Sequence, residues 1–488
     1  MHSTKGFLYI NNYEVSKISL SNKFIELACD IILNDEKFDK DGKPSGGDGV
    51  YYNWKGNPYP YKLKLNGNGH TIYGLYGVQT EEIEYFNRSL IHSSTQIDRV
   101  SNLKFDNVYL NEKTSKYVSA IGYSGASSTI ENCDLISGSV VGHQHISGLV
   151  GIAKTVRNCN NYGVNIYSSY QWVSGIVCDS YGIVESCNNY ADLYMSGTGN
   201  NRGGGIVAWL QGNGKYKIKD CTNYGNLYGQ GGQTGGIVGW LNGGLVKDCK
   251  NYGTIQGNAI SGIVGYLAGK NLKIVLDGCE NYGYIKAASY WSTGELITHV
   301  PAKETATVDE LILTNCYVRS VSGLSLLGSC AAKNYVVSNC RFDYVDSYND
   351  YSGTTTLRMF CASYNDKMFT NSSFSNIEIN ISDKINRDIK LDLGITNYRY
   401  VEAKNILVKS EHSKGTVIAF DNDPGKVSGI IVQTLRSKYM FSNDFSGFYI
   451  DWKTGNLGLK CFSGRGYFQG EVTESVLLNK GFVKKEIA

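Results

Sequence analysis

The chain has 488 residues, including 57 glycines, 37 tyrosines, 13 cysteines and only 5 prolines, and its formal net charge is +3. A nearly neutral balance without a basic cluster argues against nucleic acid as a main partner. No run of about twenty apolar residues occurs, so no membrane-spanning helix is predicted. The first residues carry no apolar run of signal-peptide length, which favours assembly inside a cell unless the N-terminus has been trimmed.

Two short segments near the N-terminus predict the opening coil of a repeat protein. They are the apolar stretch that begins at Phe24 and the sequence Leu-Asn-Gly-Asn-Gly-His-Thr-Ile from Leu65 to Ile72. A stack of coils needs such a cap, because its first coil would otherwise expose an open sheet edge. We therefore assign residues 1–75 to an N-terminal cap and opening coil.

The middle of the chain is dominated by two alternating motifs. The first, Cys-x-Asn-Tyr-Gly or a close variant, begins at Cys159, Cys187, Cys221, Cys249 and Cys279. Subtracting these numbers gives repeats of 28, 34, 28 and 30 residues. The second, Gly-Leu-Val or Gly-Ile-Val, begins at Gly148, Gly175, Gly205, Gly236 and Gly262. A third short apolar stretch follows each first motif, so every repeat offers three strands separated by turns.

Three short strands per repeat predict an all-β fold, a right-handed parallel β-helix (β-solenoid), over residues 76–380. Helical repeats are excluded, because no stretch keeps a 3.6-residue apolar period over ten or more residues. Stacked coils place equivalent side chains in columns about 4.8 Å apart, so the repeat cysteines should form one inward column. Their side chains would point the same way, which disfavours disulfide geometry and predicts free thiols.

The periodicity fades after Asn380, and residues 381–488 are predicted to form a distinct β-rich C-terminal domain. Within it, the segment from Phe448 to Leu459 predicts a hairpin with a glycine-containing turn.

The Leu65–Ile72 opening and the alternation of Gly-Ile-Val-Gly with Cys-x-Asn-Tyr-Gly resemble the GLUG-type β-solenoid repeats of bacterial surface proteins and phage tail proteins. The resemblance covers roughly residues 20–345. The end of the chain, from Phe445 to Ile487, resembles the ends of some phage tail and appendage proteins. Such repeats serve many roles, so the resemblance is specific for the fold and not for the function.

This resemblance implies a non-catalytic phage tail-fibre or tail-spike protein that binds a bacterial surface glycan or protein and contacts other phage tail proteins. It would be assembled in the host cytoplasm and carried on the virion. One alternative is a capsule or polysaccharide depolymerase, a glycoside hydrolase or lyase on the same scaffold. Another is an adhesin at the bacterial cell surface. No cofactor is predicted.

Asp220 and Asp248 are the candidates for catalysis. Both directly precede a repeat cysteine, so they should stack about 4.8 Å apart. That spacing is close to the carboxylate separation of about 5–5.5 Å in retaining glycosidases. The same column holds asparagine in other repeats, which favours a turn-capping ladder instead (Asn132, Asn158, Asn315 and Asn339).

His143 and His145 are the candidates for metal binding, because alternate positions on a strand face the same side. No third ligand lies nearby in the sequence, which favours a solvent-exposed loop.

Aromatic residues offer two kinds of candidate binding surface. The repeat tyrosines form a column that is either an exposed ladder for sugar rings or a buried corner of the coil (Tyr162, Tyr190, Tyr224, Tyr252 and Tyr282). We favour the buried, structural role, because binding sites usually interrupt repeats. Irregular insertions are the better binding candidates, and the residues selected from them are Tyr170, Trp172, Arg202, Tyr290 and Trp291.

Each Gly-Ile-Val strand carries two adjacent apolar residues, and a strand sends only one of two neighbours to the same face. The sequence therefore predicts an apolar stripe on the outside of the coil, made of the isoleucines or of the valines. A second chain, or the region after Asn380, would have to cover that stripe. By analogy with phage fibres, we predict a homotrimer.

Overall fold

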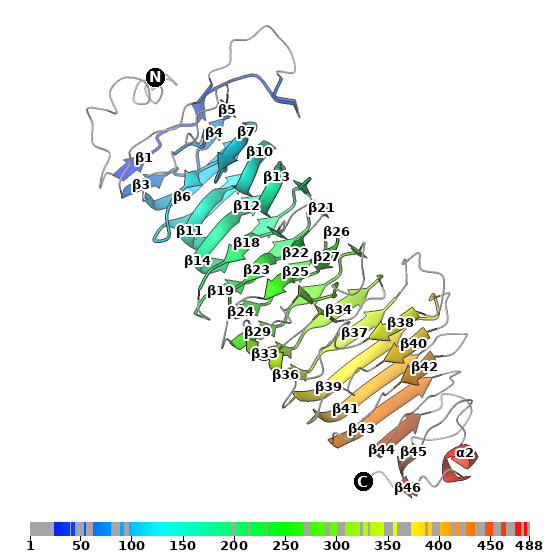
Figure 1. Cartoon of the computed structure of the whole chain (residues 1–488). Helices are drawn as coiled ribbons and strands as arrows, with labels where there is room; N and C mark the ends of the chain where they lie inside the picture. Colours follow the sequence, from blue (N-terminus) through cyan, green and yellow to red (C-terminus); the bar gives the residue numbers. More distant parts are fainter. Residues whose placement is uncertain are drawn as a thin grey trace. The chain divides into compact units, whose positions relative to one another are not determined.

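Strands of each repeat lie in parallel register with their counterparts one repeat later. Strand β11 (Val150–Arg157), which begins within the Gly-Leu-Val motif at Gly148, pairs with β14 (Val177–Glu185). Strand β12 (Asn160–Asn161) pairs with β15 (Asn188–Asn189). The longer β13 (Val164–Ser174) pairs with the strands that follow β15. In the computed structural model, the arrows of β11 and β14 lie side by side (Figure 1). The predicted fold class, an all-β parallel β-helix, is confirmed.

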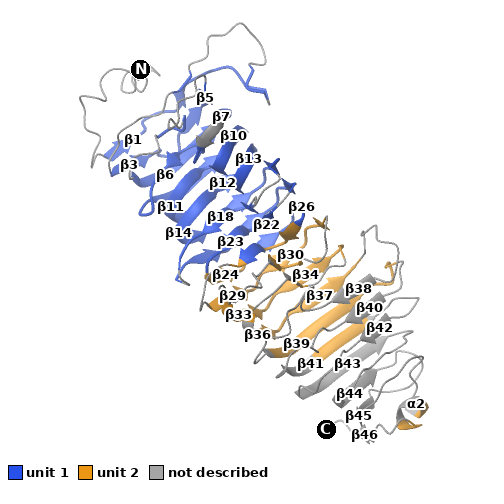
Figure 2. Ribbon diagram, in the orientation of Figure 1, with its two compact units in different colours: residues 1–242, 249–258, 264–266 blue, residues 243–248, 259–263, 267–488 orange. Residues whose placement is uncertain are grey.

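The structure describes residues 24–39, 41–43, 53–54, 62–79, 88–91, 97–197, 202–212, 215–230, 232–267, 273–287, 293–299, 308–322, 326–329, 332–345, 355–358, 372–385, 389–392, 401–410, 416–419, 426–434, 445–451, 460–464, 474–479 and 483–485. The chain divides into two compact units (Figure 2). Unit 1 comprises residues 1–242, 249–258 and 264–266, and unit 2 comprises residues 243–248, 259–263 and 267–488.

In addition to β11–β15, unit 1 contains β1 (Phe24–Glu26), β2 (Ile31–Ile32), β3 (Leu63–Asn66), β4 (Thr71–Tyr73), β5 (Tyr76–Val78), β6 (Ile97–Asp106), β7 (Val108–Lys116), β8 (Gly122–Tyr123), β9 (Thr129–Leu135), β10 (Gly138–Ser147), β16 (Leu193–Met195), β17 (Arg202–Gly204), β18 (Val207–Leu210), β19 (Lys217–Lys219), β20 (Thr222–Asn223), β21 (Leu227–Gly229), β22 (Gln233–Gly235), β23 (Val238–Leu241), β25 (Lys250–Asn251), β26 (Ile255–Gly257) and most of β28 (Val264–Leu267). The predicted opening coil is present, because β1 pairs with β3 and β2 pairs with β4.

Unit 2 contains β24 (Gly244–Lys247), β27 (Ala259–Ser261), β29 (Lys273–Asp277), β30 (Glu280–Asn281), β31 (Ile285–Ala287), β32 (Ile297–His299), β33 (Val308–Thr314), β34 (Tyr317–Ser320), β35 (Leu327–Ser329), β36 (Ala332–Ser338), β37 (Arg341–Tyr344), β38 (Thr355–Arg358), β39 (Ser372–Ile381), β40 (Ile389–Asp392), β41 (Val401–Ser410), β42 (Thr416–Ala419), β43 (Lys426–Thr434), β44 (Phe445–Asp451), β45 (Lys460–Gly464), α2 (Glu474–Asn479) and β46 (Val483–Lys485). None of the described helices is long and apolar enough to span a membrane.

Parallel stacking in unit 2 extends beyond residue 380, where the sequence periodicity fades. Strand β39 pairs in parallel with β41, β41 with β43, and β43 with β44. The change in architecture comes later, where β44 pairs antiparallel with β45 and β45 with β46. An antiparallel hairpin is therefore present, but its second strand begins at Lys460, just beyond the predicted segment that ended at Leu459.

Inside each unit the repeat cysteines form the predicted inward column. In unit 1 the backbone N–H of Asn188 donates to the carbonyl of Cys159, and that of Thr222 donates to the carbonyl of Cys187. In unit 2 the N–H of Tyr317 donates to the carbonyl of Cys279. The column cysteines are buried, and the ten cysteines whose side chains the structure describes carry thiols rather than disulfides.

The two repeat motifs pack on each other in the core. The buried amide of Asn189 donates to Oδ1 of Asn223 at 2.9 Å, and Asn223 donates to Oδ1 of Asn251 at 2.9 Å. A methyl group on Gly205 would lie only 2.4 Å from Cγ of Asn223. Glycine therefore opens the Gly-Ile-Val motif because the asparagine of the other motif occupies the space beside it.

One coil of unit 2 replaces that glycine with a buried acid. Glu295 stands at the glycine position, since its carbonyl accepts the N–H of Gly262 at 3.0 Å. Its carboxylate accepts hydrogen bonds from Asn281 and Ser320 inside the coil. This acid takes the place of the next amide in the asparagine column, which is a structural role.

The predicted apolar stripe on the outside of the coil is absent, and this prediction was wrong. Ile176 and Val177 are both fully buried, and the same holds for the equivalent pairs (Ile206 and Val207, Ile237 and Val238, Ile263 and Val264). The isoleucine lies in a bend and the valine begins the next strand, so the alternation of a regular strand does not apply there. These pairs therefore leave no apolar stripe that a partner chain would have to cover.

Candidate functional site

A bend at the first two residues of each Gly-Ile-Val motif in unit 1 brings two columns of side chains together. Before the bend, Tyr117, His145 and Trp172 occupy equivalent positions and share left-handed backbone, with φ of 61°, 58° and 57°. Their rings are neighbours along the column: Tyr117 lies tilted against His145 with centroids 4.5 Å apart, and His145 stacks on Trp172 at 5.8 Å. The left-handed backbone belongs to this corner of the coil, because all three residues share it.

After the bend, a second column faces the first. Asp179, Trp209 and Trp240 are in register on β14, β18 and β23. Trp172 stacks on Trp209 at 4.7 Å and on Trp240 at 5.1 Å. Arginine completes this aromatic corner, which we define as Trp172, Arg202, Trp209, Trp240 and Tyr266.

Within the aromatic corner the Arg202 guanidinium lies over the indole of Trp240, 3.4 Å from its centroid, and 4.7 Å from that of Trp172. Burial lowers the pKa of Arg202 to about 10. This cation–π geometry offsets part of the cost of desolvating the guanidinium. The indole N–H groups of Trp209 and Trp240 are buried and have no hydrogen-bond partner among the described residues.

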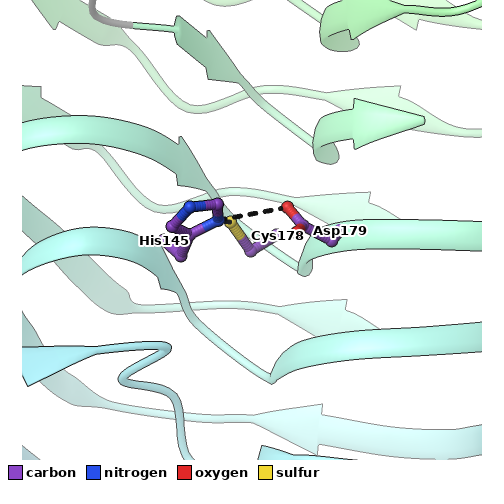
Figure 3. A group of neighbouring side chains, drawn as sticks. All are labelled: His145, Cys178 and Asp179. Atoms are coloured by element: carbon purple, nitrogen blue, oxygen red, sulfur yellow. Dashed lines mark hydrogen bonds and ion pairs between the residues drawn. The ribbon is translucent and has the colours of Figure 1, made fainter. Parts of the chain in front are cut away.

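Next to the aromatic corner lies a buried cluster of three side chains: His145, Cys178 and Asp179 (Figure 3). Nδ1 of His145 is 3.4 Å from Oδ1 of Asp179 and 3.8 Å from Sγ of Cys178. The other carboxylate oxygen accepts a hydrogen bond from Nε2 of Gln211 at 3.4 Å. Burial, together with the charge of Asp179, raises the pKa of the Cys178 thiol. The potential ligand atoms all lie within 4.8 Å of one another.

The structure unites two of the residues predicted to bind a ligand and separates a third from them. Trp172 and Arg202 meet in the aromatic corner. Tyr170 is exposed and stacks on His143, with centroids 5.1 Å apart. Tyr290 and Trp291 lie outside the described residues.

The two histidines predicted as a pair have different surroundings. The ring of His143 bonds to Oγ of Ser169 on the outside, whereas His145 is buried. The strand register shifts between Gly142 and Gln144, which breaks the regular alternation on which the pairing depended. His145 has two potential co-ligands, and both come from the following coil.

Cys178 and Asp179 were missed in the sequence, although a departure from the repeat marks them. Gly-Ile-Val is followed by Ala-Trp, Gly-Trp or Gly-Tyr in the next three repeats. Only the repeat at Gly175 continues with Cys-Asp. In the other repeats named here, these two positions hold a small residue and an aromatic residue. Two potential metal ligands at these positions were therefore the sequence signal for the site.

The tyrosine column lies on the outside, contrary to the buried role that we favoured. Tyr162, Tyr190, Tyr224 and Tyr252 are 42–48% exposed. Their centroids are 5.4, 4.6 and 5.1 Å apart in chain order, with rings within 15° of parallel. We call these four residues the tyrosine ladder. The tyrosine position lies just beyond the two-residue strand, at the corner of the coil, and this explains its exposure.

The two candidate catalytic aspartates each occupy a left-handed turn. Asp220 has φ of 52° and Asp248 has φ of 50°, as do the asparagines of the same column, such as Asn158 at 51°. In unit 1 the carboxylate of Asp220 pairs with the ammonium of Lys219 at 2.8 Å. These positions are those expected for a turn-capping column, because asparagine and aspartate tolerate left-handed backbone.

Comparison with family models, with curated proteins and with solved structures finds no significant match.

Proposed function

We propose that this chain is a non-catalytic binding protein that recognises an extended bacterial surface glycan along its tyrosine ladder. The observation that carries the proposal is the exposure of four stacked tyrosines in successive coils. Tyrosine offers a large amphipathic contact surface at low cost in conformational entropy. A stacked row loses even less, because each ring is already held by its neighbours.

The geometry of the ladder favours a polymer over a single sugar. Spacings of 4.6–5.4 Å leave no room for a sugar ring between two tyrosines. What the ladder offers to solvent is ring edges and hydroxyl groups. Among the described residues, the hydroxyls of Tyr162, Tyr190 and Tyr224 have no protein partner. A ligand with hydroxyl groups repeated along its length can bond to several of them at once and gain avidity.

The biological setting rests on the resemblance to GLUG-type repeats and to the ends of phage tail proteins. It favours a phage tail fibre or tail spike over a bacterial surface adhesin. Both settings require the same binding activity, and the turn positions of Asp220 and Asp248 give no support to a depolymerase.

A panel of bacterial surface polysaccharides, each with its short oligomers, tests the proposal. We expect binding that strengthens with oligomer length and no release of reducing ends. The double variant Tyr190→Ala/Tyr224→Ala should weaken binding at least about tenfold, as expected for the loss of a central interface cluster.

The matched control is Tyr194→Ala/Tyr228→Ala. These two tyrosines stack in the same two coils with centroids 5.1 Å apart, but they belong to a different column. Equal weakening by both double variants, or tight binding of monosaccharides, would contradict the proposed ladder. Release of reducing ends would show instead that the chain is an enzyme.

A further inference from the structure

We infer that His145, Cys178 and Asp179 form a zinc site with one coordination position left for a non-protein ligand. This inference is independent of the glycan proposal, because it concerns different side chains. All three side chains are at most 9% exposed, and they come from two neighbouring coils of unit 1. Imidazole, thiolate and carboxylate are the usual protein ligands of Zn²⁺.

The three groups converge on one point and are not arranged as a proton relay. A catalytic Cys-His-Asp relay uses both imidazole nitrogens, one facing the nucleophile and the other facing the acid. Here Sγ of Cys178 and Oδ1 of Asp179 both approach the same nitrogen, Nδ1 of His145. Figure 3 shows the sulfur and the carboxylate oxygen on the same side of the imidazole. A single ion in front of Nδ1 would contact all three.

The spacings agree with tetrahedral zinc. Bond lengths of about 2.0–2.1 Å to nitrogen, 2.0–2.2 Å to oxygen and 2.3 Å to sulfur imply ligand separations of roughly 3.4 Å for N···O and 3.6 Å for N···S. The observed separations are 3.4 Å and 3.8 Å. The third separation, between Sγ of Cys178 and the carboxylate of Asp179, is at most 4.8 Å. Tetrahedral zinc requires roughly 3.6 Å there, so metal binding would draw these two groups together by up to about 1 Å.

The surroundings also suit a metal ligand set. Gln211 holds the second oxygen of Asp179, as hydrogen-bond donors commonly do for carboxylates that bind metals. Burial, followed by the negative charge of Asp179, raises the pKa of the phenol of Tyr123. A cation at Nδ1 would neutralise this buried carboxylate. Structural zinc sites have four protein ligands, so three ligands leave one position for water or a ligand oxygen.

Metal titration of the purified full-length chain, freed of metal by a chelator, tests the site. We expect one Zn²⁺ per chain, and one Co²⁺ with a thiolate-to-cobalt charge-transfer band. Cys178→Ala should abolish that band and weaken zinc binding at least about 100-fold, since a direct ligand should matter more than its supporting groups. Gln211→Ala should weaken binding by about 10- to 100-fold.

Cys178→Ala is a suitable variant, because alanine already occupies the equivalent position of the next coil, Ala208. Its far-ultraviolet circular dichroism should match that of the parent. Cys29→Ser, which removes an exposed thiol, controls for adventitious binding and should leave the titration unchanged. Failure of the parent chain to bind either metal, or tight binding retained by Cys178→Ala, would show that the cluster is only a buried His–Asp pair.

Discussion

Asparagine forms ladders both inside and outside the coil, and water reaches only the outer ones. Inside, Asn223 is fully buried, and its amide donates to the carbonyl of Gly225 at 2.8 Å and to Asn251 at 2.9 Å. Outside, the partly exposed Asn188 donates to Oδ1 of Asn160 at 2.8 Å. The two bonds are similar in length, so the difference in their contribution to stability must come from burial.

We expect Asn223→Ala to lower the free energy of unfolding by about 1–3 kcal/mol or more, because buried partners lose hydrogen bonds that water cannot replace. Asn188→Ala should cost no more than about 0.5 kcal/mol, as is typical of surface substitutions. Chemical denaturation of both variants provides the comparison. Equal losses would mean that the inner ladder is no more important than the outer one.

The left-handed turn column shows how far residue chemistry could be predicted. Asparagine or aspartate before the repeat cysteine predicted a turn, and Asn132, Asn158 and Asp220 all have φ near 50°. The same column holds Ser186, which lacks the special tolerance of asparagine for this backbone. The coil geometry therefore fixes the turn, and the side chain adapts to it.

At the scale of elements, the bend at the Gly-Ile of each Gly-Ile-Val motif depends on close packing against the neighbouring coil and against the asparagine ladder. A methyl group on Gly205 would lie 2.2 Å from the carbonyl oxygen of Gly236, in addition to its contact with Asn223. Gly205 lies next to Gly204 in a segment where the backbones of neighbouring coils come together. Glycine is therefore required at position 205 because there is no room for a Cβ atom, and not because the backbone has a positive φ.

We expect Gly205→Ala to destabilise the chain by about 1–3 kcal/mol or more, the usual range for overpacking a core. Thermal unfolding should show a lower midpoint for this variant. The matched control is Gly151→Ala, where the nearest atom to the added methyl is 3.3 Å away and other coils already carry Cys178 or Ala208. A neutral Gly205→Ala would mean that the strands can move apart at the bend.

The strands and their inward columns were predictable, because a recurring motif places equivalent residues in register. The bends were not predictable from alternation. Ile176 and Val177 both face inward, because the rule that neighbours face opposite sides applies only within a strand. His143 and His145 do not share a face for a different reason, because the register of β10 shifts between Gly142 and Gln144. The ligand set of the candidate zinc site depends on this corner, and His145 was the only member selected from the sequence.

At the scale of the whole molecule, the repeated motifs predicted the architecture better than they predicted which side chains meet on the outer face of the solenoid. Trp172 and Arg202 were selected as parts of insertions, but Trp209 and Trp240 belong to the regular repeat and were passed over. A side chain on the outer face of a solenoid can be structural or functional, and periodicity alone does not separate the two. Only the structure shows that Trp172 contacts Trp209 and Trp240 and that Arg202 contacts Trp240, each pair coming from different coils.

The oligomeric state is the last question at this scale, and burial of the Ile-Val pairs changes the expectation. Ile176, Ile206, Ile237 and Ile263 form no apolar stripe that needs a cover, so the predicted homotrimer rests on analogy alone. We now expect light scattering of the purified chain at micromolar concentration to give a monomer mass near 53.7 kDa. A mass three times as large would restore the trimer. The tyrosine ladder, an exposed row of four stacked rings, would then be the first candidate interface, and Tyr190→Ala/Tyr224→Ala should dissociate the trimer.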